Sequence, residues 1–379
     1  MIALSIPNIC GNEKKYVMEA LEQGWVSTAG KFVDRFEENI STYLNVESAV
    51  ACQSGTAGLH LALLAAGVKQ NDMVIVPTLT FIAAVNPTKY IGAETYFIDC
   101  DKSLCMDPVK LEKYLCLDCE LREDGHTYDK ASGRKIAALV VVHVFGNMAD
   151  MVKILDLSKK YNFRIVEDAT EALGTKYIDG PLKGKFAGTM GDFGVFSFNG
   201  NKIITTGGGG MIVAKNKEDL NHCRHLSTQA KKDVVYFDHD EIGYNYRMTN
   251  VQAAMGVAQL ENLEQFITNK KLCYEYYKLE GLKLLPFRTD IRANYWFFSY
   301  MSNDRDALIK FLADKNIQTR PIWKLIHSLP MYESSPRGDL SVAEGYYNQV
   351  VNLPCSSNLL IEDVKEVASR IREFENMTK

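Results

Sequence analysis

The sequence has no long hydrophobic run. Its longest apolar stretches, such as residues 135–144, are about ten residues long, whereas a helix that crosses a bilayer needs about twenty. The opening residues, MIALSIPNICGNEKK, show no basic leader followed by an apolar segment. We therefore expect neither a membrane span nor a secretory signal, and we predict a cytoplasmic protein.

Neither sign of charge is in large excess. The chain carries 43 lysines and arginines against 47 aspartates and glutamates, which gives a formal net charge of −4. This balance offers no electrostatic reason to expect a nucleic acid or an anionic membrane as a partner. If the protein binds phosphate groups, the site has to be local.

The cysteines do not suggest a disulfide framework. There are nine of them, an odd number, scattered through a long chain, and this pattern favours free thiols in a reducing compartment. One CxxC spans Cys116 and Cys119, with Cys100 and Cys105 upstream, so a zinc or redox site is an alternative interpretation. No second CxxC supports that alternative, and we predict no metal site.

Several organising motifs are missing as well, namely an internal repeat, a low-complexity linker, a GxGxxG fingerprint and a Walker motif. From Lys31 to about Asn250, short apolar runs alternate instead with helical segments. The runs predict strands over 48–52, 72–76, 94–98, 136–144, 164–166, 193–198 and 210–214, with an apolar helix over 59–66. Such an alternation is typical of a mostly parallel sheet that is covered on both faces.

The pattern changes at two places along the chain. Segment 105–133 is polar and predicts a helix followed by a surface excursion. After Asn250, the spacing of Leu260, Leu263 and Phe266 predicts one long helix over 251–271, and a last helix is expected over 361–374. Because 379 residues exceed a typical single domain, we predict an α/β protein with a large domain at 1–250 and a small α+β domain at 251–379.

Polar residues gather where the predicted strands end. In open α/β sheets, ligands bind beyond the carboxyl ends of the strands. The residues found there are Ser54, Gly55, Thr56, Thr80, Phe81, His143, Asp168, Glu171 and Ser197, and Lys202 follows four residues after Phe198. For His143, a packed core histidine is an equally simple interpretation.

Three of these positions have both a structural and a chemical interpretation. The turn from Ser54 to Ala57 is either an ordinary N-cap or a phosphate site at a helix N-terminus. Asp168 ends an apolar strand and needs a cation, either a salt-bridge partner or a pyridinium nitrogen. Lys202 lies before a four-glycine run, as a surface lysine or as a desolvated amine able to form a Schiff base. Together with a ring platform at Phe81, the chemical interpretations fit one cofactor, pyridoxal 5'-phosphate (PLP).

At these residues the chain resembles the DegT/DnrJ/EryC1/StrS family of PLP-dependent sugar aminotransferases. The resemblance covers nearly the whole chain and includes SGTAGLHLAL, VPTLTFIAAVNP, VVHVFGNMADM, VEDATEALGT, GDFGVFSFNGNKIITTGGGGM and GYNYRMTNVQAAMG. It implies the fold of aspartate aminotransferase, which is PLP-transferase fold type I. It also implies a homodimer in which two chains build each active site.

The resemblance implies a role for each matching residue. Lys202 would be the catalytic Schiff-base lysine and proton shuttle, Asp168 would pair with the pyridine nitrogen, and Phe81 would stack on the ring. Glu171 would lie near the ring hydroxyl. The phosphate would be held by Gly55, Thr56, Ala57 and Ser197, and by Asn245 of the neighbouring subunit.

Two further residues are expected near the substrate. Arg247 lies in GYNYRM and would reach the substrate across the subunit interface. His327 lies in IWKLIHSLP, between Trp323 and Tyr332, and a packed core histidine is the alternative interpretation.

The chain also departs from the usual family pattern. Gly208 replaces the glutamate of TTGEGG, and FNGNK stands where FYPTK or FYGNK is common. With EDATEALG and the extended segment near His126, these features are similar to the subgroup that acts on 4-keto-6-deoxy-N-acetylhexosamine nucleotides. That subgroup feeds bacillosamine and legionaminic acid synthesis.

We therefore predict a PLP-dependent sugar aminotransferase (EC 2.6.1.-). Glutamate would donate its amino group, leaving 2-oxoglutarate, to a UDP- or GDP-linked 4-keto-6-deoxy sugar that enters surface glycan synthesis. Alternatives are 3-amination of a dTDP-linked 3-keto-6-deoxyhexose and a non-enzymatic PLP-binding regulator, although no DNA-binding segment is visible. A related sugar 3-dehydratase typically carries histidine in place of the lysine, and Lys202 argues against it.

Overall fold

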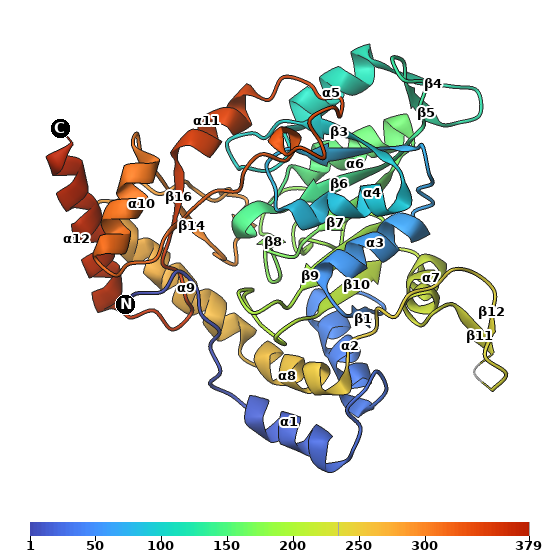
Figure 1. Ribbon diagram of the computed structural model, residues 1–379, viewed down its shortest axis with the longest axis horizontal. Helices are drawn as coiled ribbons and strands as arrows, with labels where there is room; N and C mark the ends of the chain where they lie inside the picture. Colours follow the sequence, from blue (N-terminus) through green and yellow to red (C-terminus); the bar gives the residue numbers. More distant parts are fainter. Residues whose placement is uncertain (234, 379) are drawn as a thin grey trace.

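The centre of the molecule is a seven-stranded sheet (Figure 1). The computed structural model describes residues 1–233 and 235–378. The spatial order of the strands is β1-β10-β9-β7-β6-β2-β3. Their bounds are β1 Val50–Cys52, β2 Met73–Pro77, β3 Glu94–Ile98, β6 Ile136–Val142, β7 Arg164–Asp168, β9 Phe193–Ser197 and β10 Gly210–Ala214.

The direction and burial of these strands confirm the predicted sheet. Strand β10 is antiparallel to both of its neighbours, and the other pairs are parallel. Runs such as MVIVP in β2 and IAALVVV in β6 are almost completely buried, as expected when helices cover both faces. The predicted strand ends differ from the observed ones by no more than two residues.

Four of the helices that follow these strands begin at short polar residues. Ser54, Asp107, Asp150 and Asn216 each accept a backbone N–H bond at the start of a helix. The helices of this part of the chain are α2 Lys31–Leu44, α3 Gly55–Ala65, α4 Asn86–Ile91, α5 Pro108–Leu117, α6 Met151–Tyr161 and α7 Lys217–Ser227. Helix α3 packs on β9 and β10, which places its N-terminus beside the carboxyl end of β9.

The predicted single helix over 251–271 is wrong, because the chain forms two helices there. Helix α8 spans Asn250–Leu260 and α9 spans Leu263–Leu279. Between them the side-chain amide of Asn262 donates to the Ala258 carbonyl and its backbone N–H to Gln259, so the α-helical bonding is interrupted. The break leaves α8 packed on α1 (Glu13–Glu22) and α2, while α9 packs on α12 (Ile361–Met377).

The second part of the chain carries a small antiparallel sheet of order β14-β16-β15. Its elements are β14 Phe298–Met301, α10 Arg305–Asp314, β15 Arg320–Pro321, α11 Ser341–Gln349, β16 Val350–Leu353 and α12. The first residues join this region, since Ile2 bridges Ile317 and the Leu4 carbonyl accepts from Cys355 (Figure 1). The division at residue 250 stays a prediction.

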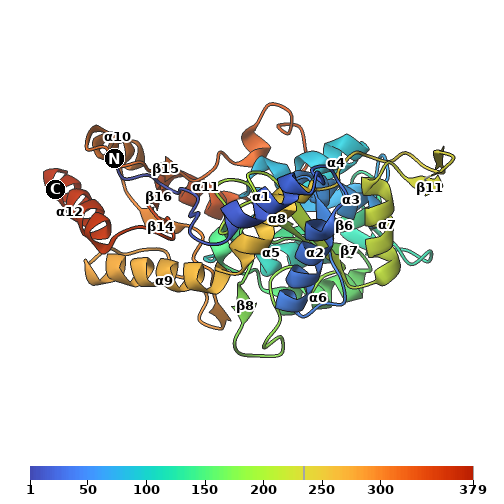
Figure 2. The ribbon, with the colours of Figure 1, turned by 90° about the horizontal axis from the view of Figure 1, so that it is seen from below.

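Short hairpins and turns complete the chain. Segment 105–133 contains the expected helix α5, and its surface excursion is a hairpin of β4 (Cys119–Leu121) and β5 (Thr127–Asp129). A second hairpin, β11 (Lys231–Asp233) with β12 (Asp238–His239), projects from the body next to α7 (Figures 1 and 2). Strands β8 (Lys176–Tyr177) and β13 (Ile291–Arg292) form another pair. Within the described residues, no helix combines the length and apolar character that a bilayer crossing requires.

Candidate active site

A cavity of about 340 Å³ opens at the carboxyl ends of the central strands. Nine of the ten residues predicted from the sequence near the strand ends line it together: Ser54, Gly55, Thr56, Thr80, Phe81, Asp168, Glu171, Ser197 and Lys202. Two tryptophans and a phenylalanine from the second part of the chain close the cavity, namely Trp296, Phe297 and Trp323. The strand ends of the large sheet and a segment distant in sequence thus line the same cavity.

One wall of the cavity is the N-terminus of α3. Ser54 is the N-cap, and its hydroxyl accepts the N–H of Ala57 at 3.1 Å. An added Cβ on Gly55 would lie 3.0 Å from the Cβ of Ser197, so this turn presses closely on the end of β9. The N–H groups of Gly55 and Thr56 and the Ser197 hydroxyl therefore form a cradle for an anionic group, favoured by the helix dipole.

Asp168 ends β7 and points a nearly buried carboxylate at the cavity. Its residue is 4% exposed, and its Oδ1 accepts the backbone N–H of Thr170 at 3.0 Å. Burial raises its pKa, while the bonds from Thr170 and the positive charge of Lys202 oppose that change. Within the described chain no cationic side chain pairs with this carboxylate. A cationic ring nitrogen in the cavity would therefore fit it.

Glu171 and Lys202 form a loose ion pair across the cavity floor. Lys202 Nζ lies 3.7 Å from Glu171 Oε1, and the two side chains are 11% and 3% exposed. Glu171 Oε2 accepts the backbone N–H of Phe145 at 2.8 Å. This carboxyl group is consequently fixed in place on the side away from the amine.

The same burial shifts the pKa values of both groups toward neutrality. Burial lowers the pKa of the Lys202 amine, although the charges of Glu171 and Asp168 oppose the change. Burial raises the pKa of Glu171 to about 7, against the attraction of Lys202 and the Phe145 N–H. The neutral form of an amine attacks an aldehyde and accepts protons. Burial favours that form of Lys202.

Aromatic side chains make the remaining walls. The Lys202 ammonium lies 4.2 Å from the ring centroid of Trp296, and Phe81 lies 6.4 Å from Trp323, centroid to centroid. Phe81 is 51% exposed and lines the cavity. The sequence interpretation missed Trp296 and Trp323, because neither lies at a strand end of the large sheet.

Several predicted residues lie away from this cavity. The Ala57 N–H is occupied by Ser54, and Asn245 is exposed in the segment after β12. Arg247 Nη1 lies 2.8 Å from Glu37 Oε1 and 3.1 Å from the Ala51 carbonyl, in an ion pair within the chain. The roles predicted for Asn245 and Arg247 require a second subunit, and they stay predictions.

The two histidines singled out in the sequence are both engaged elsewhere. His143 is fully buried, and its Nε2 lies 2.8 Å from Glu167 Oε2. His327 Nδ1 lies 2.6 Å from the hydroxyl of Thr78. Burial lowers the pKa of His327, and the charge of Arg337 adds to that change. Neither histidine lines the cavity in the described chain.

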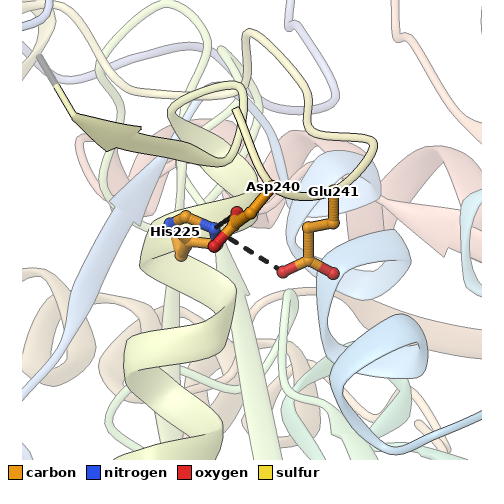
Figure 3. A group of neighbouring side chains, drawn as sticks. All are labelled: His225, Asp240 and Glu241. Carbon is orange, nitrogen blue, oxygen red and sulfur yellow. Dashed lines mark hydrogen bonds and ion pairs between the residues drawn. The ribbon is translucent and has the colours of Figure 1, made fainter. Parts of the chain in front are cut away.

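A group with metal-ligand side chains lies outside the cavity, where His225 of α7 faces Asp240 and Glu241 of the segment after β12 (Figure 3). His225 Nε2 is 2.7 Å from Asp240 Oδ1 and 3.7 Å from Glu241 Oε1, and His222 Nε2 is 2.9 Å from the same Glu241 oxygen. Each side chain already has a partner, and both acids are exposed. We interpret these contacts as polar contacts that hold the segment after β12 against α7.

The CxxC motif lies at the end of α5 and the start of β4. Cys116 is exposed and Cys119 is buried. Burial raises the pKa of the Cys119 thiol to about 12. A thiolate is the form that binds metals or exchanges disulfides, so this environment favours a packed thiol over a redox or zinc site.

Comparisons with known proteins agree with this geometry. Residues 7–372 match the DegT/DnrJ/EryC1/StrS aminotransferase family. The chain is 38% identical to GDP-perosamine synthase from Escherichia coli O157:H7, over 97% of each chain. It is 30% identical to UDP-4-amino-4,6-dideoxy-N-acetyl-beta-L-altrosamine transaminase from Campylobacter jejuni, over 97% of this chain and 96% of that one. Among solved structures, the aminotransferase TlmJ from Streptoalloteichus hindustanus superposes with a TM-score of 0.89 at 26% identity, over 100% of both chains.

Proposed function

The chain belongs to the DegT/DnrJ/EryC1/StrS aminotransferase family, and from that premise we propose that it transfers the amino group of glutamate to a nucleotide-linked 4-keto-6-deoxy sugar. The protein is a PLP-dependent aminotransferase that acts on nucleotide sugars. The observation that carries this function is one buried amine, Lys202, facing a cavity between a phosphate-type cradle and two carboxyl groups. The carbon that is aminated and the nucleotide belong to the proposal.

PLP, when bound, supplies an aldehyde and an aromatic ring that accepts the electrons released at the substrate carbon. The residues of the cavity fit such a group. Gly55, Thr56 and Ser197 would hold its phosphate, and the carboxylate of Asp168 would pair with its ring nitrogen. Phe81, which lines the cavity, would stack on one face of the ring.

Lys202 and Glu171 would carry out the proton transfers. Lys202 would anchor the cofactor through its amine, and the freed amine would then take up and return the proton released at the substrate carbon. Glu171 lies close enough to keep this amine oriented, and its pKa of about 7 lets it hold or release a proton near neutral pH. One amine therefore serves as anchor and as base.

The 4-amino assignment rests on the relatives and on the sequence pattern. The Campylobacter jejuni relative is named for a UDP-linked 4-amino-4,6-dideoxy sugar, and the Escherichia coli relative for a GDP-linked sugar. The pattern EDATEALG is similar to that of 4-keto-sugar enzymes of bacillosamine and legionaminic acid synthesis. We propose that the product is a 4-amino sugar for a surface polysaccharide, with UDP or GDP as the nucleotide.

A homodimer with shared sites is proposed from the charge of the cavity. Among the described residues that line it, Lys202 is the only lysine or arginine, and Asp168 and Glu171 oppose it. A cofactor phosphate and a nucleotide diphosphate both need cationic or hydrogen-bonding partners. A second chain could supply them from the segment after β12, where Asn245 is exposed.

The nine unpaired thiols of the described chain support the proposed location in a reducing cytoplasm.

The substrate proposal is tested with a small panel of keto-sugars. The holoenzyme is incubated with glutamate and each of the UDP-, GDP- and dTDP-linked 4-keto and 3-keto 6-deoxy sugars, and the products are identified by mass spectrometry and NMR. We expect amination at C4 of a UDP- or GDP-linked sugar. Amination at C3 of the dTDP-linked sugar as the preferred reaction would overturn the assignment.

The shared site is tested by subunit mixing. We expect Lys202→Ala and Asn245→Ala each to be inactive or impaired alone, but a mixed dimer would contain one site with both native residues. We expect mixing under exchange conditions to restore activity toward one quarter of the wild-type value, the share of such sites in a random mixture. Two copies of Lys202→Ala mixed in the same way are the control. Unchanged activity with confirmed exchange would contradict a shared site.

A further inference from the structure

The segment Asn294–Trp296 connects the two halves of the candidate site. The indole Nε1–H of Trp296 donates to the carbonyl of Asn201 at 2.8 Å, on the peptide that precedes Lys202. The face of the same ring lies 4.2 Å from the Lys202 amine. One side chain therefore contacts both the backbone and the reactive atom of the catalytic lysine.

Asn294 fixes this segment to the loop that carries Glu171. Its buried side-chain amide donates to the carbonyls of Glu171 at 2.9 Å and Leu173 at 3.0 Å. Its Oδ1 accepts the N–H of Trp296 at 3.0 Å. The peptide that bears the tryptophan is thus tied by one amide side chain to the peptide that bears the carboxyl group.

The other side of Trp296 is equally constrained. The Cys355 thiol donates to its carbonyl at 3.3 Å, and Phe297 stacks on its ring with centroids 4.1 Å apart. Both the ring and the backbone of Trp296 are therefore held by the second part of the chain. Trp296 itself is only 3% exposed.

We propose that Trp296 is a positioning residue that holds the Lys202 amine opposite Glu171, through its ring face and its bond to the Asn201 carbonyl. This inference rests on the proposed function, in which that amine carries a proton between two carbons. A lysine side chain has a flexible four-carbon stem and loses considerable entropy when it is fixed. A displacement of about 1 Å can slow a reaction about a hundredfold, so a contact that fixes the amine has a large kinetic effect.

The two contacts can be separated by substitution. Trp296→Phe keeps an aromatic face and removes the N–H donor, whereas Trp296→Leu removes both. We expect the loss of one hydrogen bond to slow the reaction about tenfold. The further loss of the ring attraction brings the decrease to about a hundredfold. Trp25→Leu is the matched control, because Trp25 is a 59% exposed tryptophan outside the site.

The first measurement is amide hydrogen exchange of residues 199–203 in the cofactor-free protein. The Lys202 N–H donates to the Asn199 carbonyl at 2.9 Å, so its exchange reports opening of this turn. We expect about tenfold faster exchange in both Trp296 variants, and none of this change in Trp25→Leu. Wild-type exchange in both variants would contradict the proposal.

The second measurement is the glutamate half-reaction, followed as the absorbance change of the bound cofactor without any sugar. We expect the maximal rate to fall and the half-saturating glutamate concentration to stay within about threefold. A rate that is kept while glutamate affinity falls would show that Trp296 binds substrate and does not position the amine. If Trp296→Leu does not fold, Trp296→Phe decides alone. Because no sugar is used, a wrong sugar assignment leaves this result unaffected.

Discussion

Two buried lysines of this protein lie in very different surroundings. Lys202 faces the cavity at the end of the large sheet, with Glu171 at 3.7 Å and the ring of Trp296 at 4.2 Å. Lys270, on α9, is 3% exposed and donates to the Cys355 carbonyl within the second part of the chain. Within the described chain it has no carboxylate partner, and it does not line that cavity.

Burial lowers the pKa of both amines. The shift in proton affinity therefore does not distinguish them. What differs is access: Lys202 adjoins a space lined by an anion cradle, two carboxyl groups and aromatic faces, whereas Lys270 is enclosed by packed side chains and main chain. A desolvated amine becomes a catalytic candidate only where a reactant can reach it.

Lys202→Ala is expected to have the largest effect on activity. It removes the amine that anchors the cofactor and moves the proton, so kcat should fall by at least about 10⁴-fold. The variant should also lose the visible absorption of the cofactor bound to the wild-type protein. Turnover and an absorbance spectrum of the purified variant check both effects. A variant that keeps either property would refute the role of Lys202.

Asp168→Asn should have the next largest effect. The amide keeps the shape of the carboxylate and can still accept the Thr170 N–H, but it no longer pairs with a cationic ring nitrogen. We expect kcat/KM to fall by about 10²–10³-fold, the size seen when one preorganised electrostatic partner is lost. Steady-state kinetics with saturating PLP separates this from weaker cofactor binding.

Gly146→Ala would disturb the junction between the two regions. An added Cβ would lie 1.9 Å from Asn294 Oδ1, and Gly146 has a φ of +88°. We expect a stability loss of about 3 kcal/mol and about a tenfold fall in kcat, because Asn294 has to move. Gly184→Ala is the matched control, with a φ of +86° and no atom within 4 Å of the added Cβ.

Gly184→Ala should therefore cost about 1 kcal/mol from backbone strain alone and leave kcat unchanged. Urea denaturation and turnover of both variants provide the measurements. Equal losses in the two variants would mean that the contact of Gly146 with Asn294 has no role of its own.

Lys270→Met should have the smallest effect on activity. The change keeps an unbranched side chain, one heavy atom shorter, and leaves the cavity intact, so kcat should stay within about threefold, or roughly 0.6 kcal/mol. Its effect should be on stability as a function of pH. Because the folded pKa of Lys270 is lowered, the unfolded chain binds more protons than the folded one between that value and the ordinary pKa of about 10.4.

The sign of that pH dependence follows directly. The contribution of Lys270 to the free energy of unfolding rises with pH through this window. This rise is absent in Lys270→Met. Urea unfolding of the cofactor-free proteins at several alkaline pH values should show a steeper rise for the wild type than for the variant. Parallel curves would show that burial does not lower the pKa of the Lys270 amine.

The strand-end residues of the site were predictable because their signal is local. Asp168 is the last residue of the strand RIVED, and Gly55 comes three residues after the strand VAC, so the position of each residue is set by the strand at which it lies. The parallel arrangement then brings the ends of neighbouring strands together. The sheet was predicted for the same reason.

Trp296 and Asn294 carry no such signal. They lie in NYWFF, an irregular aromatic stretch outside the large sheet, and reach the site only through the packing of the second part of the chain. The break at Asn262 was also missed, because apolar spacing continues across it while one side-chain bond interrupts the helix. Tertiary contacts of this kind leave no periodic trace in a single sequence.

The most direct test of the central claim is to locate the amine that carries the cofactor. Reduction of the holoenzyme with borohydride fixes the pyridoxyl group to that amine, and peptide mass spectrometry then identifies the residue. We expect the label on the peptide that contains Lys202, with none on the peptide that contains Lys270. Label on Lys270, or on any lysine outside the cavity, would contradict the account.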